Sequence, residues 1–530
     1  MRTVPTASKR FVSSIHTRRH NDRLIKRRKG RCVMAGIAGV LGNDRGTLDL
    51  MLERIKYRGP DETWKHENGT VNIGCNELNV GGTGQDGSHY ASDGARAVTL
   101  DGRVYNRKME NESDAAAILN LYKRHGNDFA SKVDGDFACA IVDGDQLVLA
   151  RDWAGIKPLY YGHDRDGNLC FASEAKALVD ISYNIREFPP GYVYSRALGF
   201  RKYNNKEAVK TPEFENYEQA RKVVKELLME ATEKRMKDNA VTGILLSGGL
   251  DSSLIAWMAH EIKRDIECFT VSMEEGQDLP LAQDVTAYLG VKHHILMFDE
   301  KEINKILPLA IHHQEMYEES CVHGAIANFL AGRFIKGKAN CVLTGEGADE
   351  FFGGYNGQYK QASNPEELAG IIDNLINVAH NTALQRLDRL NAANSYESRT
   401  PFLDARVMDF ALKIPLEHKI FGKGQTGKWV VRQAFEGCLP EHIIYQTKRF
   451  FAQGSGVAYI MRQQAERVIS EDDLKAFNSV EGNPLLASVE ELYYYRIFKE
   501  TLSHPTFDRL VGRWDPMRPA FFPEWANPKY

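Results

Sequence analysis

The nine residues LLSGGLDSS at 245–253 combine the residue types that hold a phosphate chain. An apolar run ends at Ser247, Gly248 and Gly249 follow, and a helical pattern starts near Asp251. Glycines let backbone N–H groups approach an anion closely, and a helix N-terminus adds partial positive charge. Because Asp251 would repel phosphate directly, the pattern favours a Mg²⁺ ion between the two. The alternative is an ordinary turn between a strand and a helix.

A second cluster of acids follows an apolar run at 343–355, LTGEGADEFFGGY. The run ends in the glycines around Glu346, and Asp349 and Glu350 come next. Parallel α/β sheets bind ligands at the carboxyl ends of their strands. We therefore predict that Asp349 makes a second contact to the metal and that Glu346 lies near the reacting carbon. The alternative is a solvated acidic turn before a helix.

The segment GKGQTGKW at 422–429 has the glycine and lysine spacing of another phosphate-binding loop, GxxxxGK[ST]. Trp429 stands where that motif needs a magnesium-binding hydroxyl, and no clear strand comes before it. We interpret this segment as a loop that leads into a helix.

The spacing of apolar residues predicts an N-terminal α+β domain. From Met34 to about Ser195, short alternating runs are separated by Gly, Asn and Asp, which is typical of packed antiparallel sheets. The predicted strands and hairpins include 96–106, 136–152 and 169–178, and the predicted helices are 48–58 and 114–125.

The rest of the chain alternates strands with helices. Apolar residues at helical spacing predict a helix at 217–237. The predicted strands that follow are 240–249, 265–273, 291–298 and 338–347, with helical segments between them. This alternation is typical of a parallel, doubly wound α/β sheet. Beyond about Lys360 the pattern is mostly helical.

The chain of 530 residues is too long for one core and predicts two or three domains. With 43% apolar residues, 26% charged residues and a net charge of −3, its composition is that of ordinary globular proteins. No apolar run is long enough to span a membrane. The eight cysteines include no CxxC pair, which argues for a reducing compartment and against a disulfide scaffold or structural zinc.

Residues 1–33 differ from the rest, because they hold eleven Lys or Arg and a single acid, Asp22. Without an apolar segment they are not a secretory signal. Three interpretations stay open: a start at Met34 with 1–33 untranslated, an organelle transit peptide, or a disordered basic tail that meets nucleic acid. The expected location is the cytoplasm, or an organelle if 1–33 is a targeting signal.

Four segments of the C-terminal half together resemble the asparagine synthetase family: SGGLDSS, GEGADEFFGGY, ESRTPFLD at 397–404 and QTKRFFAQGSG at 446–456. The N-terminal half is similar to the glutaminase domain of that family in MAGIAGV, RGPDE, LARDWAGIKPLYYG and FASEAKAL. The likeness extends from about Met34 to Lys499. It implies an Ntn-hydrolase-like glutaminase domain at 34–205 and an ATP pyrophosphatase (PP-loop) synthetase domain, of the adenine nucleotide α-hydrolase-like fold, at 206–530.

The resemblance also implies a reaction with ATP and Mg²⁺ as cofactors. A carboxylate is adenylated, pyrophosphate leaves, and an amine then displaces AMP. Asp251 and Asp349 would hold Mg²⁺. The implied ATP contacts are Leu246, Ser247, Gly248, Gly249, Asp251, Ser252, Ser253, Val271, Ser272, Met273, Gly345 and Glu346.

Three residues have catalytic roles implied by the same resemblance. Lys448 would stabilise charge as the amide forms. Glu346 would orient or deprotonate the attacking amine, with Glu397 as a second candidate. As alternatives, Glu397 pairs only with Arg399, and Lys448 is half of a basic surface pair with Arg449.

The glutaminase half lacks the residues that its resemblance requires. Ala35 stands where the nucleophilic cysteine belongs, and Glu77 where an arginine binds the carboxylate of glutamine. Asp101 replaces an oxyanion-hole asparagine, and Arg103 replaces a glutamate that holds the amino group. Losing a nucleophile costs on the order of 10⁶ in rate, and losing an oxyanion donor roughly 10²–10³ more. We therefore predict an inactive glutaminase, with a new ion pair between Glu77 and Arg103.

The leading hypothesis is an asparagine synthetase-like carbon–nitrogen ligase that uses ammonia or another amine directly. Aspartate is the default acid, although the segment EESCVHGAIANF at 318–329, in the expected acid-binding region, departs from the usual enzymes. The alternatives are a β-lactam-synthetase-like enzyme, disfavoured by Glu346 where those enzymes have tyrosine, a natural-product amide ligase with a larger amine, and an ATP-binding scaffold without turnover. The expected partners are a small-molecule carboxylate and ammonia or an amine, with a homodimer as a further candidate; neither a membrane nor nucleic acid is expected.

Overall fold

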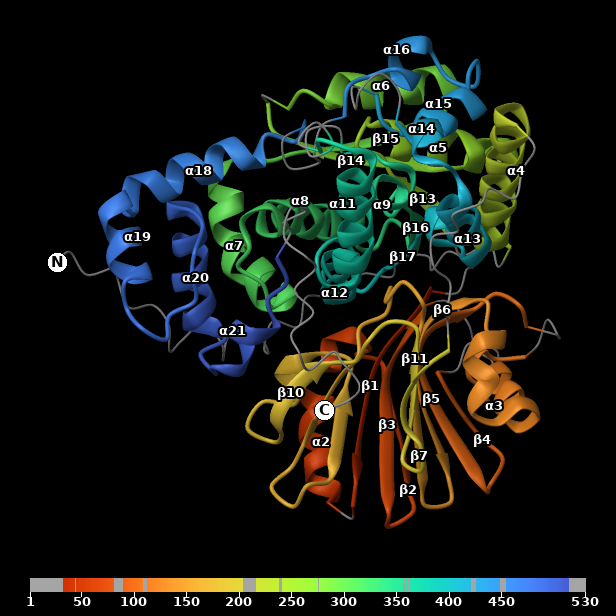
Figure 1. Cartoon of the computed structure of the whole chain (residues 1–530), viewed down its shortest axis with the longest axis vertical. Helices are drawn as coiled ribbons and strands as arrows, with labels where there is room; N and C mark the ends of the chain where they lie inside the picture. Colours follow the sequence, from red (N-terminus) through yellow and green to blue (C-terminus); the bar gives the residue numbers. More distant parts are fainter. Residues whose placement is uncertain are drawn as a thin grey trace.

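The computed structural model describes residues 32–42, 44–80, 89–107, 112–203, 216–237, 241–274, 276–355, 359, 362–420, 426–448 and 454–513. In these residues one domain is built on two antiparallel sheets and a second on one parallel sheet (Figure 1). The predicted domain boundary at 205/206 and nearly all of the basic segment 1–33 lie outside the described residues.

The N-terminal domain contains two six-stranded sheets, with strand orders β10-β8-β9-β1-β3-β2 and β12-β11-β7-β6-β5-β4. Its strands are β1 Cys32–Leu41, β2 Glu62–Glu67, β3 Val71–Val80, β4 Tyr90–Ser92, β5 Arg96–Val104, β6 Gly135–Asp143, β7 Gln146–Arg151, β8 Tyr160–His163, β9 Leu169–Ala172, β10 Tyr183–Glu187, β11 Tyr192–Ser195 and β12 Gly199–Lys202. Its main helices are α2 Arg45–Arg54 and α3 Asp114–His125. Both predicted helices are therefore present, and each quoted segment contains a strand, although β9 covers only the first part of the predicted 169–178 and a 3₁₀ turn follows at Ala175–Ala177.

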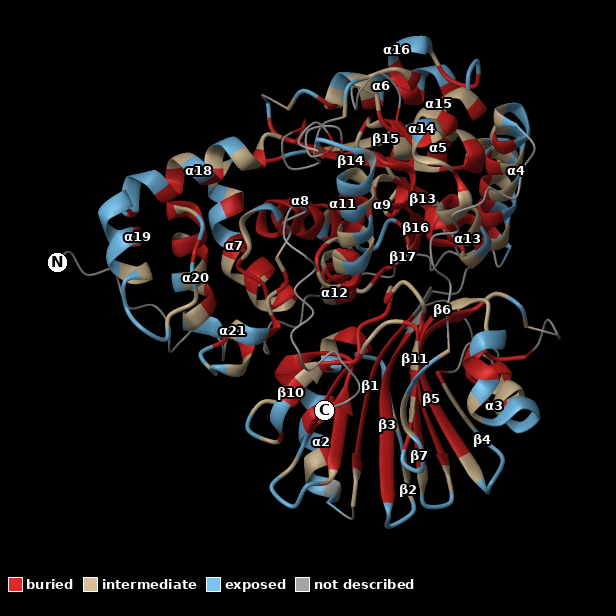
Figure 2. Cartoon of the chain, in the orientation of Figure 1, coloured by how far each residue is buried: buried red, intermediate tan, exposed pale blue. Residues whose placement is uncertain are grey.

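The two sheets pack face to face, because alternate residues of each strand are apolar and point inward. Ile37 and Ile73 of one sheet share a fully buried cluster with Ala138 and Leu149 of the other. The opposite faces are covered by α2 and α3, which gives a helix–sheet–sheet–helix sandwich. Figure 2 shows that burial continues along both sheets, with exposed residues at the turns.

The C-terminal domain is organised around a parallel sheet of strand order β15-β14-β13-β16-β17. The strands are β13 Val241–Leu245, β14 Glu267–Ser272, β15 Lys292–Met297, β16 Cys341–Leu343 and β17 Glu397–Arg399. The chain builds outward from β13 through β14 to β15 and then returns to place β16 on the other side. The strand order therefore reverses between β13 and β16, which is where such sheets bind ligands.

Helices surround this sheet and make up most of the remaining chain, as the sequence predicts. They are α4 Tyr217–Met236, α5 Leu250–Ile262, α6 Leu279–Leu289, α7 Glu300–Gln314, α8 Glu319–Ile335, α9 Ala348–Phe352, α11 Pro365–Val378, α12 Ala383–Ala393, α13 Ala405–Lys413, α14 Leu416–Lys419, α15 Trp429–Ala434, α16 Glu441–Ile444, α18 Val457–Val468, α19 Glu471–Asn478, α20 Val489–Thr501 and α21 Thr506–Leu510. Local sequence sets their ends: Asp299 and Glu302 form a capping box on α7, and Gly290 closes α6 in the left-handed conformation.

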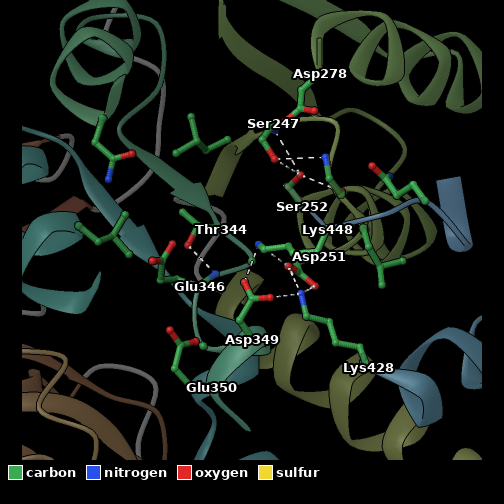
Figure 3. Close-up of a pocket in the computed structure, with 18 of the residues that line it drawn as sticks. Ser247, Asp251, Ser252, Asp278, Thr344, Glu346, Asp349, Glu350, Lys428 and Lys448 are labelled. Carbon is green, nitrogen blue, oxygen red and sulfur yellow. Dashed lines mark hydrogen bonds and ion pairs between the residues drawn. The ribbon is translucent and has the colours of Figure 1, made fainter. Parts of the chain in front are cut away.

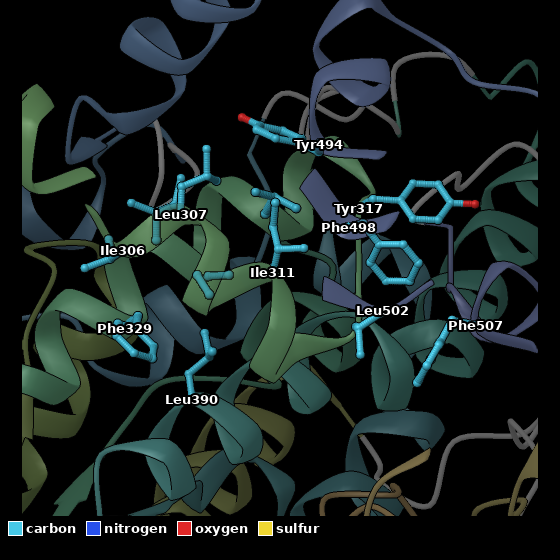
Figure 4. Packing of buried hydrophobic residues seen from close by; sticks show 14 of the residues in the cluster. Ile306, Leu307, Ile311, Tyr317, Phe329, Leu390, Tyr494, Phe498, Leu502 and Phe507 are labelled. Carbon is cyan, nitrogen blue, oxygen red and sulfur yellow. The ribbon is translucent and has the colours of Figure 1, made fainter. Parts of the chain in front are cut away.

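One apolar cluster joins helices that are far apart in the sequence (Figure 4). Ile311 of α7, Phe329 of α8, Leu390 of α12 and Phe498 of α20 are all at most 5% exposed and belong to it. Helix α12 is therefore packed into the helical lobe on one side, and it contacts the N-terminal domain on another.

Two details of the secondary structure differ from the sequence prediction. Strand β16 covers only Cys341–Leu343 of the predicted 338–347, because the glycines after it form the turn. Strand β17 was not predicted, since three residues are too few to show a periodic pattern. The seven cysteines whose side chains are described are free and buried. Among the described helices, none is long and apolar enough to cross a membrane.

Lys419, the last residue of α14, gives a testable link between burial and stability. Its side chain is 3% exposed, and burial lowers its pKa from 10.5 to about 8, although Asp373 opposes the shift. The unfolded chain therefore binds more protons than the folded one between these pH values, so the free energy of unfolding should rise as pH increases from about 8 to 10.5. Lys419→Met should abolish that rise and stabilise the fold at pH 7 by about 1–3 kcal/mol.

Denaturant unfolding at pH 7 and pH 10 measures both effects. Lys475→Met, on the surface of α19, is the control, because that lysine side chain is 75% exposed. It should change neither the free energy of unfolding at pH 7 nor its rise with pH. Equal pH dependence in the wild type and Lys419→Met would contradict the assignment.

Candidate active site

The phosphate loop, residues 247–253, connects β13 to α5 at the switch point of the parallel sheet. Gly248 has φ +88°, and a Cβ there would lie 2.4 Å from the backbone oxygen of Asp278. A Cβ on Gly345, in the following acidic turn at 345–350, would lie 2.7 Å from Cβ of Asp251. The glycines of the two motifs thus allow the two turns to pack directly against each other.

The serine hydroxyls of the phosphate loop do not all face the same way. Ser247 and Ser252 line the pocket, and their hydroxyl oxygens lie 3.0 Å apart. Ser253 is fully buried, and its hydroxyl donates to the carbonyl of Gly249 at 2.7 Å. Ser253 therefore holds the shape of the loop, whereas the other two hydroxyls are placed to contact a ligand.

Asp251 and Asp349 face each other across the pocket (Figure 3). The ammonium of Lys428 lies 2.5 and 2.6 Å from the two carboxylate oxygens of Asp251 and 2.6 Å from Oδ1 of Asp349. Lys448 lies 2.6 Å from Oδ2 of Asp349 and 3.9 Å from Asp251. The predicted convergence of the two acids and of Lys448 is therefore present in the structure.

The lysines control the charge of Asp349. Burial by itself would raise the pKa of this carboxyl, but Lys428 and Lys448 outweigh it and lower the pKa to about 2. In return, Asp349 and Asp251 raise the pKa of Lys448 above its ordinary value despite its burial. Asp349 and Lys448 are thus both charged at neutral pH. The side chain of Lys448 is 24% exposed and pairs with Asp349, whereas the alternative of a surface pair with Arg449 falls on a residue outside the described ones.

Lys428 is a site residue that the sequence interpretation missed. Helix α15 begins at Trp429 as expected, whereas 422–425 lie outside the described residues, so the interpretation of 422–429 as a loop stays a prediction. Lys428, however, is only 2% exposed, has φ +56° and donates its backbone N–H to Gly353 at 3.2 Å. The Gly-Lys pair of GKGQTGKW was the sequence signal for this lysine. Apolar periodicity, however, does not show which turn a lysine in a loop contacts.

Glu346 occupies the sheet-edge side of the same pocket, as predicted. Its carboxylate accepts a hydrogen bond from Nη2 of Arg386, on α12, at 2.6 Å. Glu350 is buried beside it and bonds to Tyr355, and burial together with Asp349 raises the pKa of Glu350 to about 7. Asn328, from the predicted acid-binding segment on α8, also lines this side.

The structure does not bring Glu397 into the pocket, in contrast to its predicted second catalytic role. Glu397 begins β17, at the amino end of the parallel strands and away from the phosphate loop. It is 3% exposed, and its carboxylate accepts from Arg399 at 2.8 Å and from Arg103 of the N-terminal domain at 3.0 Å. The alternative, a pair with Arg399, is present and includes a partner from the other domain.

The remaining predicted nucleotide contacts lie close to the loop. Val271, Ser272 and Met273 are buried at the carboxyl end of β14, which neighbours β13, and the N–H of Met273 donates to Ser455. Leu246 and Gly248 belong to the phosphate loop region without lining the pocket, whereas Ser247, Gly249, Gly345 and Glu346 line it. Contact of these residues with ATP stays a prediction.

The position that corresponds to the family's nucleophile lies inside a strand of the N-terminal domain. Ala35 lies inside β1, fully buried, and pairs across the sheet with Glu77. Arg58, which is also fully buried, donates from Nε to the carbonyl oxygen of Ala35 at 2.9 Å. Glu77 accepts from the backbone N–H of His89 at 2.6 Å, and its predicted ion pair with Arg103 stays a prediction.

The fold and the two sites define a two-domain amidotransferase-type chain. A family model described as a glutamine amidotransferase domain matches residues 32–237, and one described as asparagine synthase matches 223–381 and 373–506. The chain is 33% identical to asparagine synthetase [glutamine-hydrolyzing] 3 of Arabidopsis thaliana, over 88% of this chain and 87% of that protein. The enzyme of Asparagus officinalis is 32% identical over 88% and 85%. The chain belongs to the asparagine synthetase family.

The phosphate loop offers a matched pair of substitutions. Gly248→Ala should destabilise the protein by about 1–3 kcal/mol, because alanine is strained at φ +88° and meets backbone atoms there. Gly249→Ala should have little effect, since φ is −67° and the nearest atom is the Ser247 hydroxyl at 3.3 Å. Thermal unfolding of both variants checks this, and equal losses would contradict the assigned loop geometry.

Proposed function

We propose that this member of the asparagine synthetase family is an ATP-dependent, AMP-forming ligase that joins a carboxylic acid to ammonia or another free amine. The glutaminase-like domain takes no part in releasing ammonia from glutamine. Aspartate is the first acid to test.

The observation that supports this proposal is the pair of carboxylates at the switch point. Asp251 and Asp349 both contact the single ammonium of Lys428, so both can contact one cation. Oδ1 of Asp349 lies 2.6 Å from that ammonium, so this oxygen already faces a positive charge. Two carboxylates beside an anion-binding loop fit Mg²⁺. When bound, Mg²⁺ would neutralise charge on the phosphate groups of ATP.

The protein groups around this pair supply the other functions of a ligase site. Backbone N–H groups of the phosphate loop and the N-terminus of α5 favour bound phosphate. Lys448 is held at the pocket by Asp349, and its positive charge would stabilise negative charge on the leaving pyrophosphate or on the forming amide. These groups are fixed before a substrate binds, so little reorganisation is needed.

The acid would bind on the Glu346 side of the pocket, where Arg386 and Asn328 lie. Arg386 provides a cation for a carboxylate, although Glu346 already accepts one of its hydrogen bonds. His323, in the divergent segment of α8, points elsewhere: it pairs with Glu490, which also accepts from Tyr494 at 2.5 Å. The segment thus contributes Asn328 rather than a second cation to the acid site.

The amine would come from solution rather than from glutamine. Four positions of the glutaminase pocket lack the required groups, and Arg58 contacts the carbonyl of Ala35 at the nucleophile position. Glu346, facing the acid site, is the group available to orient the attacking amine. The same residue disfavours the β-lactam-synthetase-like alternative, and the complete set of Asp251, Asp349 and Lys448 disfavours a scaffold that binds ATP without turnover.

The direct test measures pyrophosphate release with a panel of carboxylic acids, with and without ammonium, and identifies products by mass spectrometry. We expect acid-dependent release of pyrophosphate, formation of AMP and loss of activity on chelation of Mg²⁺. Asp251→Asn and Asp349→Asn should each lower the rate by on the order of 10²-fold or more, since each removes charge from the cation site. Release that is independent of any acid, or absent with every acid, would refute the ligase assignment.

A second prediction concerns glutamine. The purified protein should form no glutamate from glutamine, and Ala35→Cys should not restore this activity. In the full-length chain the new thiol would lie inside β1 without a free α-amino group, and Asp101 and Arg103 would be unchanged. A coupled glutamate assay measures it, with a Ser247→Ala variant as background. Glutamine-dependent ammonia release above that background would contradict the prediction.

A further inference from the structure

We propose that the glutaminase-like domain positions the acid-binding side of the ligase site, through Arg58 acting on α12 and Arg103 acting on β17. This inference rests on the proposed function of the C-terminal pocket. It assigns a role to two positions at which the glutaminase pocket departs from the family, Asp101 and Arg103.

Arg58 joins the two domains through α12. Its Nη2 lies 2.7 Å from Asp101 and 2.7 Å from Asp388, and its Nη1 lies 2.8 Å from Glu174. Asp388 belongs to α12 of the C-terminal domain, whereas the other two acids belong to the N-terminal domain. Asp101, in place of the oxyanion-hole asparagine, thus helps to hold the arginine that holds α12.

Helix α12 presents a different face to the ligase pocket. Arg386 is two residues from Asp388, which places the two side chains on roughly opposite faces of the helix. Arg386 holds Glu346 at 2.6 Å, and Leu387 lines the pocket. The N-terminal domain contacts the helix at a second point, where Arg389 donates to the hydroxyl of Tyr160 at 2.7 Å.

A second path leads from Arg103 to Glu346, the residue that Arg386 contacts. Arg103 binds Glu397 at 3.0 and 3.3 Å, and Glu397 also pairs with Arg399 of the same strand, β17. The carbonyl oxygen of Arg399 accepts the backbone N–H of Thr344 at 3.0 Å. Thr344 lies two residues before Glu346 and lines the pocket. Both paths therefore end at Glu346, one through its side chain and one through its backbone.

These contacts are shielded from water. Arg58, Asp101 and Glu174 have fully buried side chains, and those of Asp388, Arg103 and Glu397 are at most 6% exposed. Salt screens such pairs weakly, and removing one partner leaves a buried charge without compensation. The contacts are therefore stiff connections between the domains rather than exposed surface pairs.

The two paths lead to the side of the pocket proposed for the acid rather than to the phosphate loop. They end on α12 and at the β16–β17 side of the pocket, whereas the phosphate loop follows β13 and packs against α5. Glu346 and Gly345 are only two of the twelve predicted ATP contacts, and the other ten lie at or after the carboxyl ends of β13 and β14. Weakening either path should therefore affect binding and orientation of the acid much more than binding of ATP. A domain that served only as a stabilising platform would show no such difference.

Arg103→Met is the main test variant, because Glu397 keeps Arg399 as a partner. With aspartate, or the acid that gives the fastest pyrophosphate release, kcat/KM for the acid should fall by roughly 10- to 100-fold through a raised KM and a lowered kcat. KM for ATP should change by less than about two-fold, and Arg103→Lys should restore part of the loss. Asp388→Asn, which weakens the α12 path, should give the same pattern.

Lys234→Met is the matched control. Lys234 also bridges the domains, through Asp134 at 2.7 Å, but it lies on α4 and does not line the pocket. The Lys234→Met variant should have a lower melting temperature and an unchanged KM for the acid. If Arg103→Met and Asp388→Asn only lower the melting temperature, or raise both KM values equally, the positioning role is refuted while the ligase assignment stands. A wild type that turns over no acid refutes both.

Discussion

Two carboxylates that share a cation are the constraint on which the C-terminal domain depends. Asp251 follows β13 and Asp349 follows β16, and these strands are neighbours only because the strand order reverses between them. Gly345 allows its turn to touch Asp251, and Gly248 allows the phosphate loop to pass the backbone at Asp278. Two acids this close would repel each other, so Lys428 and Lys448 lie between them. The same arrangement supports the proposal that the two carboxylates hold Mg²⁺.

Buried charges also lie at the contact between the domains. There they pair with each other, some of them across the contact. Two positions that resemble a glutamine site carry paired charges: Asp101 contacts Arg58, and Arg103 contacts Glu397. Pairs of this kind add little net stability over apolar residues but specify one arrangement of the partners. These polar groups of the N-terminal domain therefore help to fix its place beside the C-terminal domain.

The sequence predicted the parts of the site that follow strands and contain glycine. SGGLDSS and GEGADE have fixed spacing, so Ser247, Asp251, Glu346 and Asp349 could be placed at one edge of a sheet before any coordinates. Lys428 and Arg386 could not, because the first comes from an irregular loop and the second from one face of a helix whose partner is unknown from sequence. Glu397 was misplaced for a related reason: β17 is too short to be recognised, so its direction and the end at which Glu397 lies were not available. Arg103 was identified as a changed residue, but its partner is 294 positions away.

The course of β1 constrains position 35 through the backbone. The strand runs without interruption from Cys32 through position 35, and Met34 and Val33 pair in register with Leu78 and Asn79. In a chain that contains these residues, an α-amino group at position 35 would require cleavage of the preceding peptide bond and the loss of three pairs of this ladder. Backbone pairing in β1 thus limits the chemistry of position 35 independently of the side chains at 77, 101 and 103.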